Sequence, residues 1–363
     1  MSVTPSSIPK LTIGLDLGDR TSRTYEVDDE GRRQAEAAVA TTRHGMQRYF
    51  GERTPCRVVL EASTHSPWVS QELTALGHEV IVANPAAMFK RARRRRRRND
   101  AIDAELLARQ GRADPTLLHP VTHRQPTAQQ HLEILKARDQ LVRTRTQLIN
   151  HVRCVGKVSG TRLRATSAAA FVARGAPDIP PEMRVALEPL AQIIADLNQQ
   201  IREADHEISR LIHDRYPVAE RLQQISGVGP LTALAFVLLV DEPARFDNSR
   251  DVGAYFGLVP RLDESSDSQP QLRISKCGDA LGRRLLVTAA HYILGPFGPD
   301  CDLRRHGQRI AERGGKNAKK RGVVAVARKL AVLLHRLWVS DRPYDPDYIQ
   351  QRQPHAAGAS MPH

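Results

Sequence analysis

Apolar runs of strand length alternate with helix-like segments near the N-terminus. Four such runs, each followed by a turn signal or ending in an acidic residue, indicate strands at residues 11–16, 24–27, 56–61 and 78–83. Between them, segments 34–50 and 66–76 predict helices. Because strands and helices alternate, we expect a mixed sheet flanked by helices, which is an α/β arrangement.

The middle of the chain carries apolar residues at helical spacing. One stripe, with charged residues between its members, covers residues 187–211; a second passes through Ile134, Leu141 and Leu148 on a helix predicted over 126–153. These stripes predict a coiled coil or a helix pair. They could pack within one chain as an antiparallel pair or between chains as a dimer arm, because periodicity alone does not identify the partner.

The remaining hydrophobic pattern predicts a helical C-terminal third, with apolar helices at 231–240 and 323–337. The stretch 156–181, which contains Gly and Pro, predicts a turn or a flexible excursion. The fold class is therefore α/β plus all-α. The expected divisions are an N-terminal domain at 1–125, a coiled-coil helical region at 126–218, a helical C-terminal domain at 219–342 and a disordered, Pro-, Gln- and His-rich tail at 343–363.

The charge of the chain indicates an anionic partner of extended shape. There are 54 Lys and Arg against 40 Asp and Glu, a net charge of +14, and nucleic acid fits best. Aromatic residues make up only 4%, which argues against a protein that reads single-stranded bases by stacking. A run of seven arginines suits sequence-independent phosphate contacts, although a solvated charge run has the same composition. It comprises Arg91, Arg93, Arg94, Arg95, Arg96, Arg97 and Arg98.

Other features of composition narrow the class of protein. The longest apolar run, 233–240, is too short to span a bilayer, and the N-terminus lacks a secretory signal. We therefore expect a cytoplasmic, nucleoid-associated protein without a membrane partner. Its four cysteines are scattered and form no CxxC pair, so the sequence indicates neither a zinc site nor a disulfide framework.

Four carboxylates stand where a predicted strand ends or a predicted helix begins. Asp16 and Glu61 end two strands, and Asp100 and Asp103 share one face of a helix that opens at Asp100. Since the carboxyl ends of neighbouring strands meet at one edge of such a sheet, the four can meet there. Each acid alone could be a turn former, a rim charge or a helix cap. Together they are typical of an RNase H-like nuclease, in which carboxylates hold Mg²⁺ at a phosphodiester.

Two further segments carry residues suited to phosphate binding. Gly227 and Gly229 belong to a GVGP turn before an apolar helix, and such a turn can direct backbone N–H groups at an anion. Lys316, Lys319 and Lys320 belong to a Gly- and Lys-rich cluster before the last apolar helix. An ordinary helix-to-helix turn and a surface loop that caps the helix are the structural alternatives.

Several motifs resemble those of the IS110 family of transposases. The segments at 13–18, 58–63, 82–85 and 99–104 resemble its N-terminal DEDD domain, which is similar to the RuvC Holliday junction resolvases. The resemblance implies an RNase H-like (RuvC-like) fold for the N-terminal domain, and family members more often have Lys or Thr where this chain has Asn99. The metal ligands that it implies, for Mg²⁺ in a one- or two-metal site, are Asp16, Glu61, Asp100 and Asp103.

The C-terminal third carries a second part of the resemblance. From the GVGP turn through 256–261 to 274–276, the chain resembles the IS116/IS110/IS902 transposase domain. In that family a loop serine is the strand-transfer nucleophile, and the distance to Ser275 places it at Ser265. Ser266 stands where the family normally has Gly, so which hydroxyl attacks stays open. By composition alone this loop is an ordinary solvated turn. Candidate phosphate contacts in the same series are Lys276, Arg283 and Arg284.

The resemblance also implies a function. Ser265 would attack a DNA phosphodiester to give a covalent phosphoserine link, strands would exchange through a junction-like intermediate, and a structured RNA would bridge donor and target DNA. Because a serine hydroxyl needs a base or a metal to activate it, we expect a composite site to which the carboxylates and the C-terminal domain both contribute. A homo-oligomer, either a dimer or a tetramer, is the expected assembly.

Three other functions fit parts of the sequence. A RuvC-like junction resolvase would need the four acids but no covalent serine. An actin-like ATPase or sugar kinase would use Asp16, Leu17 and Gly18 before Thr21 as a phosphate loop, but an arginine run is unusual in that class. A non-catalytic nucleic-acid-binding protein would need neither metal nor nucleophile.

Overall fold

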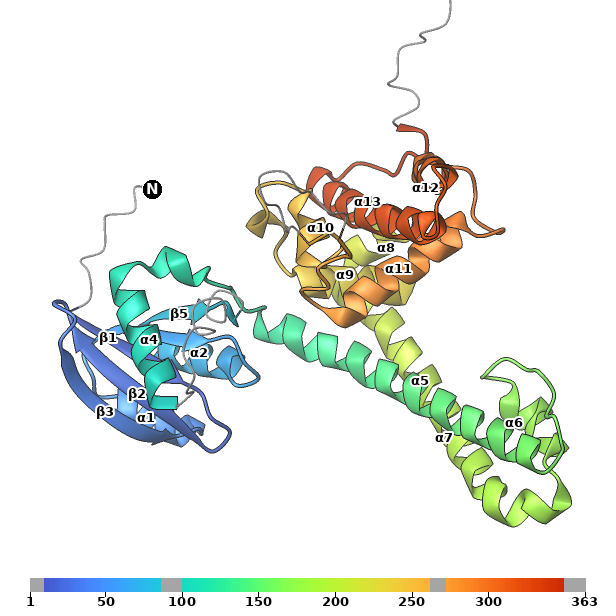
Figure 1. The fold of residues 1–363 in the computed structure, drawn as a ribbon, viewed down its shortest axis with the longest axis horizontal. Helices are drawn as coiled ribbons and strands as arrows, with labels where there is room; N and C mark the ends of the chain where they lie inside the picture. Colours follow the sequence, from blue (N-terminus) through green and yellow to red (C-terminus); the bar gives the residue numbers. More distant parts are fainter. Residues whose placement is uncertain (1–9, 86–99, 262–271, 349–363) are drawn as a thin grey trace, which may run out of the picture. The chain divides into compact units, whose positions relative to one another are not determined.

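A computed structural model describes residues 10–85, 100–261 and 272–348 (Figure 1). The chain divides into two compact units, residues 1–124 and 125–363, which we describe separately. Two of the sequence predictions fall outside the described residues: the arginine run from Arg91 to Arg98 and the candidate nucleophile Ser265 with its neighbour Ser266.

The first unit contains a five-stranded mixed sheet, as the sequence predicted. Its order is β3-β2-β1-β4-β5; β1, β2 and β3 pair antiparallel, while β4 and β5 continue parallel to β1. The strands are β1 (Leu11–Asp16), β2 (Thr21–Asp28), β3 (Arg33–Ala40), β4 (Arg57–Glu61) and β5 (Glu79–Ala83). Parallel pairing of β1 with β4 brings their carboxyl ends to the same edge.

Helices cover both faces of this sheet. Helices α1 (Arg43–Phe50) and α2 (Ser66–Ala75) contribute to one apolar cluster, to which β1 contributes Ile13 and Leu15. Helix α4 (Asp100–Ala113) packs on the opposite face. Because successive side chains of a strand point to opposite faces, the residues between these apolar ones point toward α4.

Small residues let α4 lie unusually close to the sheet. A Cβ atom added to Gly14 would lie 1.9 Å from the carbonyl oxygen of Ala104, so the glycine is required for this approach. Near the other end of the helix, Arg57 Nη1 donates a hydrogen bond to the Gly111 oxygen at 3.0 Å. Since Arg57 begins β4, the C-terminal end of α4 lies over the start of that strand. The helix therefore runs antiparallel to β4, with its N-terminus toward the carboxyl edge of the sheet.

The prediction of a helix at 34–50 is wrong for the first half of this segment. Residues 33–40 form β3, which pairs with the outer side of β2, and only 43–50 are helical. The alanines of this segment favour a helix by intrinsic propensity, but the unpaired backbone of β2 offers hydrogen bonds that only a strand can use. The break between the two elements is marked by Thr42, whose hydroxyl accepts a hydrogen bond from the Gly45 N–H at 3.0 Å.

The second unit begins with two long helices that pack side by side, α5 (Pro126–Val158) and α7 (Arg184–Arg215), with α6 (Phe171–Arg174) near their far end (Figure 1). They run antiparallel, because Arg138 pairs with Asp205 at 2.8 Å and Arg145 donates to Asn198 at 2.7 Å. The structure thus pairs the two predicted stripes within one chain. The supercoiled geometry of a coiled coil stays a prediction.

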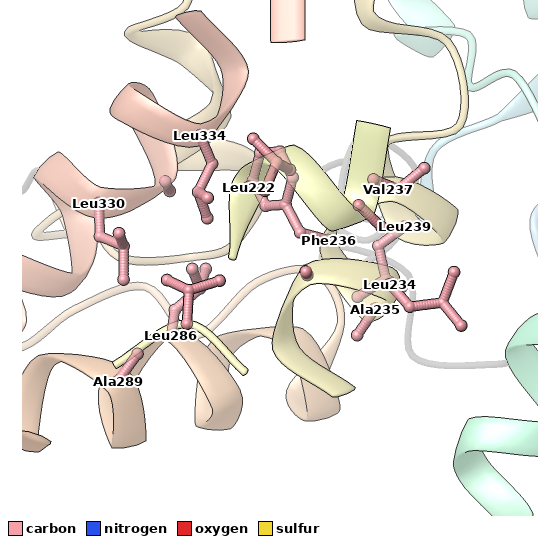
Figure 2. Close-up of a cluster of buried hydrophobic side chains, with 14 of the residues drawn as sticks. Leu222, Leu234, Ala235, Phe236, Val237, Leu239, Leu286, Ala289, Leu330 and Leu334 are labelled. Carbon is pink, nitrogen blue, oxygen red and sulfur yellow. The ribbon is translucent and has the colours of Figure 1, made fainter. Parts of the chain in front are cut away.

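The core of the second unit is built around α9 (Pro230–Val240), which is apolar on every side. Each residue from Thr232 to Val240 is buried, and each fully buried Leu, Val or Phe side chain stabilises the fold by roughly 1.5–3 kcal/mol. Figure 2 shows its side chains facing Leu222, Leu286 and Leu334. The other helices of this part of the unit are α8 (Pro217–Leu222), α10 (Asp251–Tyr255), α11 (Ala280–Leu294), α12 (Asp302–Glu312) and α13 (Ala318–Ser340).

The segment after α13 packs on α12 for part of its length. The Asp302 N–H donates to the Pro346 oxygen at 2.8 Å, and Arg305 pairs with Asp347. The disorder predicted from residue 343 therefore does not apply to 343–348, and residues 349–363 lie outside the described part. None of the described helices is long and apolar enough to cross a membrane. All four cysteines are free.

Candidate active site at the carboxyl edge of the sheet

The register of the sheet places Asp16 beside Glu61. Leu15 of β1 is aligned with Leu60 of β4 in a parallel pair, so the next residue on each strand, Asp16 and Glu61, stands at the same level. Both follow a residue buried against α1 and α2, and both therefore point to the face that α4 covers. Two carboxylates far apart in the sequence thus share one corner of the sheet.

Helix α4 adds two more carboxylates at this corner. Asp100 and Asp103 occupy its first turn, and that turn lies toward the carboxyl edge because the helix runs antiparallel to β4. They continue the stripe that packs on the sheet, which passes through Ala104, Leu107 and Gly111. Acidic residues also stabilise the N-terminus of a helix, so the position suits them structurally as well.

The four carboxylates form one electrostatic cluster around Asp16. The pKa of Asp16 is raised from 3.8 to about 6, first by burial and then by the negative charges of Asp100, Asp103 and Glu61. Desolvation and like charges both disfavour the ionised form. The structure therefore brings together the four acids that the sequence singled out, and the charges of the other three each raise the pKa of Asp16.

A hard divalent cation suits this donor set. Carboxylate oxygens are the ligands that Mg²⁺ prefers, and a cation would offset the repulsion that raises the Asp16 pKa. The side chains are not yet at ligand distances: in the described segments, no group of three or more His, Cys, Asp and Glu residues is gathered closely enough to hold a metal ion. The chemistry of the four carboxylates fits a divalent cation, whereas their side chains are not in a coordinating arrangement.

His65 lies in the turn that follows β4 and was not among the sequence-predicted residues. Its Nδ1 accepts a hydrogen bond from Trp68 Nε1 at 3.3 Å, so the proton of a neutral ring is on Nε2, which lies 3.7 Å from Asp19 Oδ1. A histidine four residues beyond a strand-end glutamate was the available signal. Both His65 and Asp19 belong to turns at the carboxyl edge.

In the second unit, the GVGP turn connects α8 to α9. Gly227 has a φ of +89°, and a Cβ atom there would lie 3.0 Å from the Tyr292 ring and 3.1 Å from the Ala289 oxygen. Packing against α11 thus explains this glycine. Gly229 precedes the first turn of α9, and a Cβ atom there would meet nothing within 4 Å. Phosphate binding by this turn stays a prediction.

Two of the predicted cationic contacts have protein partners. Arg283 donates to the carbonyl oxygens of Cys277 at 2.9 Å and Phe256 at 3.3 Å, so it holds together the backbone around residues 256–277. Arg284 pairs with Asp139 at 2.6 Å and ties α11 to α5. Both arginines therefore have structural roles that the sequence did not reveal.

Of the remaining candidates, Lys276 lies beside the paired segments around Pro260 and Ile274, and the other three lie at the start of α13. Pro260 and Ile274 form an isolated antiparallel bridge, and the Ser275 N–H donates to the Val259 oxygen at 2.8 Å. Lys276 follows with a φ of +56°. Lys316 precedes α13, and Lys319 and Lys320 lie in its first turn.

Comparisons with known proteins cover both units. Residues 13–155 match the IS110-type DEDD transposase family, and residues 219–299 match the transposase IS116/IS110/IS902 family. The transposase for insertion sequence element IS1111A of Coxiella burnetii is 30% identical to this chain over 256 residues, which are 68% of each protein. The chain belongs to the IS110 family of transposases.

Longer alignments with other transposases agree with this IS110-family membership. A protein of Pseudomonas aeruginosa named probable family 20 transposase is 28% identical over 349 residues, which are 92% of this chain and 98% of the relative. The transposase for insertion sequence element IS1328 of Yersinia enterocolitica is 29% identical over 287 residues, 78% of this chain and 84% of the relative. The IS110-family transposase described here is thus an enzyme that cleaves and rejoins DNA. This excludes the kinase and the non-catalytic alternatives.

Proposed function

We propose that this transposase rejoins DNA strands through a covalent phosphoserine at Ser265 and that Asp16, Glu61, Asp100 and Asp103 hold the Mg²⁺ that the reaction requires. The observation that supports the metal site is the convergence of four carboxylates at one edge of the sheet, with the Asp16 pKa raised to about 6. A cluster of this kind is costly unless a cation joins it. The serine is supported by the family and by its distance to Ser275.

The four carboxylates come from two kinds of element, two from strand ends and two from a helix. Asp16 and Glu61 project from the ends of paired strands, so their positions are set by the sheet and they provide a rigid pair of oxygen donors. Asp100 and Asp103 project from the first turn of α4 and complete the set. Mg²⁺, when bound, would neutralise the phosphoryl oxygens and lower the pKa of a coordinated hydroxyl.

In the proposed covalent step, each phosphate ester bond that is broken is replaced by an equivalent phosphate ester bond. Attack of the Ser265 Oγ on the DNA phosphorus forms a serine–phosphate ester and breaks the bond between phosphorus and one sugar oxygen. The serine hydroxyl gives up its proton, and the leaving sugar oxygen takes up a proton to become a hydroxyl. Attack of a hydroxyl from the other DNA strand reverses these steps, rejoins the DNA and frees the serine. No nucleotide cofactor is required, because each bond broken is replaced by an equivalent one.

We also propose that a structured RNA bridges the donor and target DNA and that the enzyme acts as a homo-oligomer, a dimer or a tetramer. Both proposals follow from the family resemblance. The net charge of +14 supports a second polyanionic partner besides DNA.

The test is whether DNA becomes attached to Ser265. Full-length protein is purified with its RNA, the RNA is sequenced, and the complex is incubated with DNA carrying the element ends and Mg²⁺. After denaturation, mass spectrometry should find a DNA fragment on Ser265. The adduct should disappear in Ser265→Ala and in Asp103→Ala and persist in Ser266→Ala.

The resolvase alternative makes a different forecast with the same variants. The first unit alone carries the carboxylate cluster, so a resolvase would cleave DNA without the serine. Recombination that survives Ser265→Ala but is lost in Asp16→Ala would refute the phosphoserine mechanism.

A further inference from the structure

A large hollow lies along α13 in the second unit. Its volume is about 1560 Å³, and its walls come from α12, from residues 342–348 and from the paired segments around Pro260 and Ile274. From Lys320 to Ser340 one continuous face of α13 forms its floor. At 1.5 Å per residue this face is about 30 Å long. The hollow thus follows the helix for nearly its whole length.

The floor alternates between cationic and apolar turns. Lys320 and Arg321 are followed by Val324 and Ala325; Arg328 and Lys329 come next, then Val332 and Leu333, and finally Arg336. The cationic turns recur every eight residues, or about 12 Å along the axis. A regular row of cations separated by small apolar surfaces matches an elongated anion with less polar parts between its charges.

The lining is strongly positive, because its cations far outnumber its acidic residues. Ten of its side chains are Lys or Arg, and only Asp302 and Asp345 are acidic. Asp302 pairs with Arg305, and an Asp345 carboxylate oxygen accepts a hydrogen bond from the Asp347 N–H at 2.9 Å. The ion pairs described at this place join Arg305 to Asp300, Asp302 and Asp347, and Arg305 does not line the hollow. The hollow therefore carries charge that an external anion can neutralise.

Neighbouring groups show the effect of this unbalanced charge. The pKa of His306, which lines the hollow, is lowered from 6.5 to about 4 by burial and by the charges of Lys329, Arg309 and Arg313. The pKa of Lys329 is lowered by burial and by Arg309, and Asp302 opposes this shift. Positive potential at this level favours binding of a polyanion.

We propose that the hollow along α13 binds the sugar–phosphate backbone of the DNA strand that is cut. Lys or Arg side chains would contact phosphates, and the apolar turns would lie against sugars. DNA rather than RNA is assigned because Pro260, Arg273 and Ile274 line the hollow and form the base of the segment that contains Ser265. The choice of strand rests on the proposed serine mechanism, whereas binding itself does not.

The experiment compares two triple variants of the full chain that lose the same charge. The hollow variant is Arg328→Gln/Lys329→Gln/Arg336→Gln. The control, Arg162→Gln/Arg174→Gln/Arg202→Gln, changes arginines that do not line the hollow. Binding to labelled DNA and to RNA of the same sequence is measured in EDTA over a range of KCl, so that no strand is cut.

The hollow variant should bind DNA at least about tenfold more weakly at physiological salt, and the slope of log affinity against log salt should shrink by about 2.7, or about 0.9 per lost phosphate contact. The control should keep both values near those of the wild type. Equal losses in the two variants would overturn the proposal, since net charge would then explain them.

Two further outcomes would also overturn it. If RNA binding fell and DNA binding did not, the hollow would be an RNA site; if neither changed, its occupant would be another anion such as an acidic peptide. Should the triple variant fail to fold, Lys329→Gln replaces it, because burial already disfavours that charge; its slope should shrink by about 0.9. Absence of a Ser265 adduct would refute the serine mechanism and leave these binding results unaffected.

Discussion

The ionised carboxylate of Asp16 destabilises the folded protein, and this cost should be measurable without any DNA. Its pKa is raised to about 6 in the folded protein, against 3.8 for the free side chain. The folded state therefore binds more protons than the unfolded state between these values, and stability falls as the pH rises through this window. Above about pH 6, the metal-free protein carries the full cost of an ionised Asp16.

Asp16→Asn should remove this cost. In EDTA at pH 7 the variant should be more stable than the wild type by about 1–2 kcal/mol, a value reduced for the partial exposure of the side chain. The difference in unfolding free energy between variant and wild type should shrink toward pH 4, where Asp16 is protonated in the folded wild type. Added Mg²⁺ should raise the melting temperature of the wild type much more than that of Asp16→Asn. Thermal unfolding across pH, with and without Mg²⁺, measures each quantity; a variant less stable than the wild type at pH 7 would contradict the repulsion.

At the residue scale, the four acids were predictable from the sequence because each stands at the end of an element, and strand ends meet at one edge. The cations of the α13 hollow were not. Arg328, Lys329 and Arg336 are separated by apolar residues, so the segment reads as an apolar helix. Only the structure shows that they share one face. The sequence also did not reveal the structural role of Arg283, whose guanidinium donates to two carbonyl oxygens; a phosphate contact by this arginine stays a prediction.

At the element scale, the active site depends on how closely α4 approaches the sheet. Gly14→Ala should destabilise the first unit by about 3 kcal/mol, although alanine normally suits a strand interior better than glycine, because the added methyl would lie 1.9 Å from the Ala104 oxygen. Ala38→Val, on the exposed outer strand β3, is the control and should change stability little. Chemical denaturation measures both. Equal stability of Gly14→Ala and wild type would mean that α4 is not seated on Gly14.

Element types were predicted better than element partners. The strands at β1, β4 and β5 and the long helices were predicted because their apolar patterns are strong. Residues 33–40 were predicted as helix, since pairing with β2 is a long-range contact that local propensity does not contain. The partner of the α5 stripe was open for a similar reason. The contacts that decide it, Arg138 with Asp205 and Arg145 with Asn198, join positions more than fifty residues apart.

At the scale of the whole molecule, the division at residues 124 and 125 predicts two unfolding transitions. Each unit has its own apolar clusters, so each should unfold cooperatively by itself. Mg²⁺ should raise only the transition of the first unit, by the equivalent of about 2.7 kcal/mol at a hundredfold excess over the dissociation constant. Differential scanning calorimetry measures the two transitions, and Gly14→Ala identifies the first, because it should lower that one alone. A single transition that Mg²⁺ shifts as a whole would contradict the division.

The bridge between Pro260 and Ile274 has a consequence for how this enzyme can vary. On either side of this bridge the backbone is also hydrogen-bonded: the Arg261 N–H donates to the Arg273 oxygen at 3.0 Å and the Ser275 N–H to the Val259 oxygen at 2.8 Å. Among the described residues, the apolar core of this unit is formed by the helices around α9. Length and sequence in the segment between Arg261 and Arg273 can therefore change without a matching change in the scaffold. The segment is suited to exchange between relatives as a cassette, and reaction chemistry can diverge while the helices around α9 stay the same.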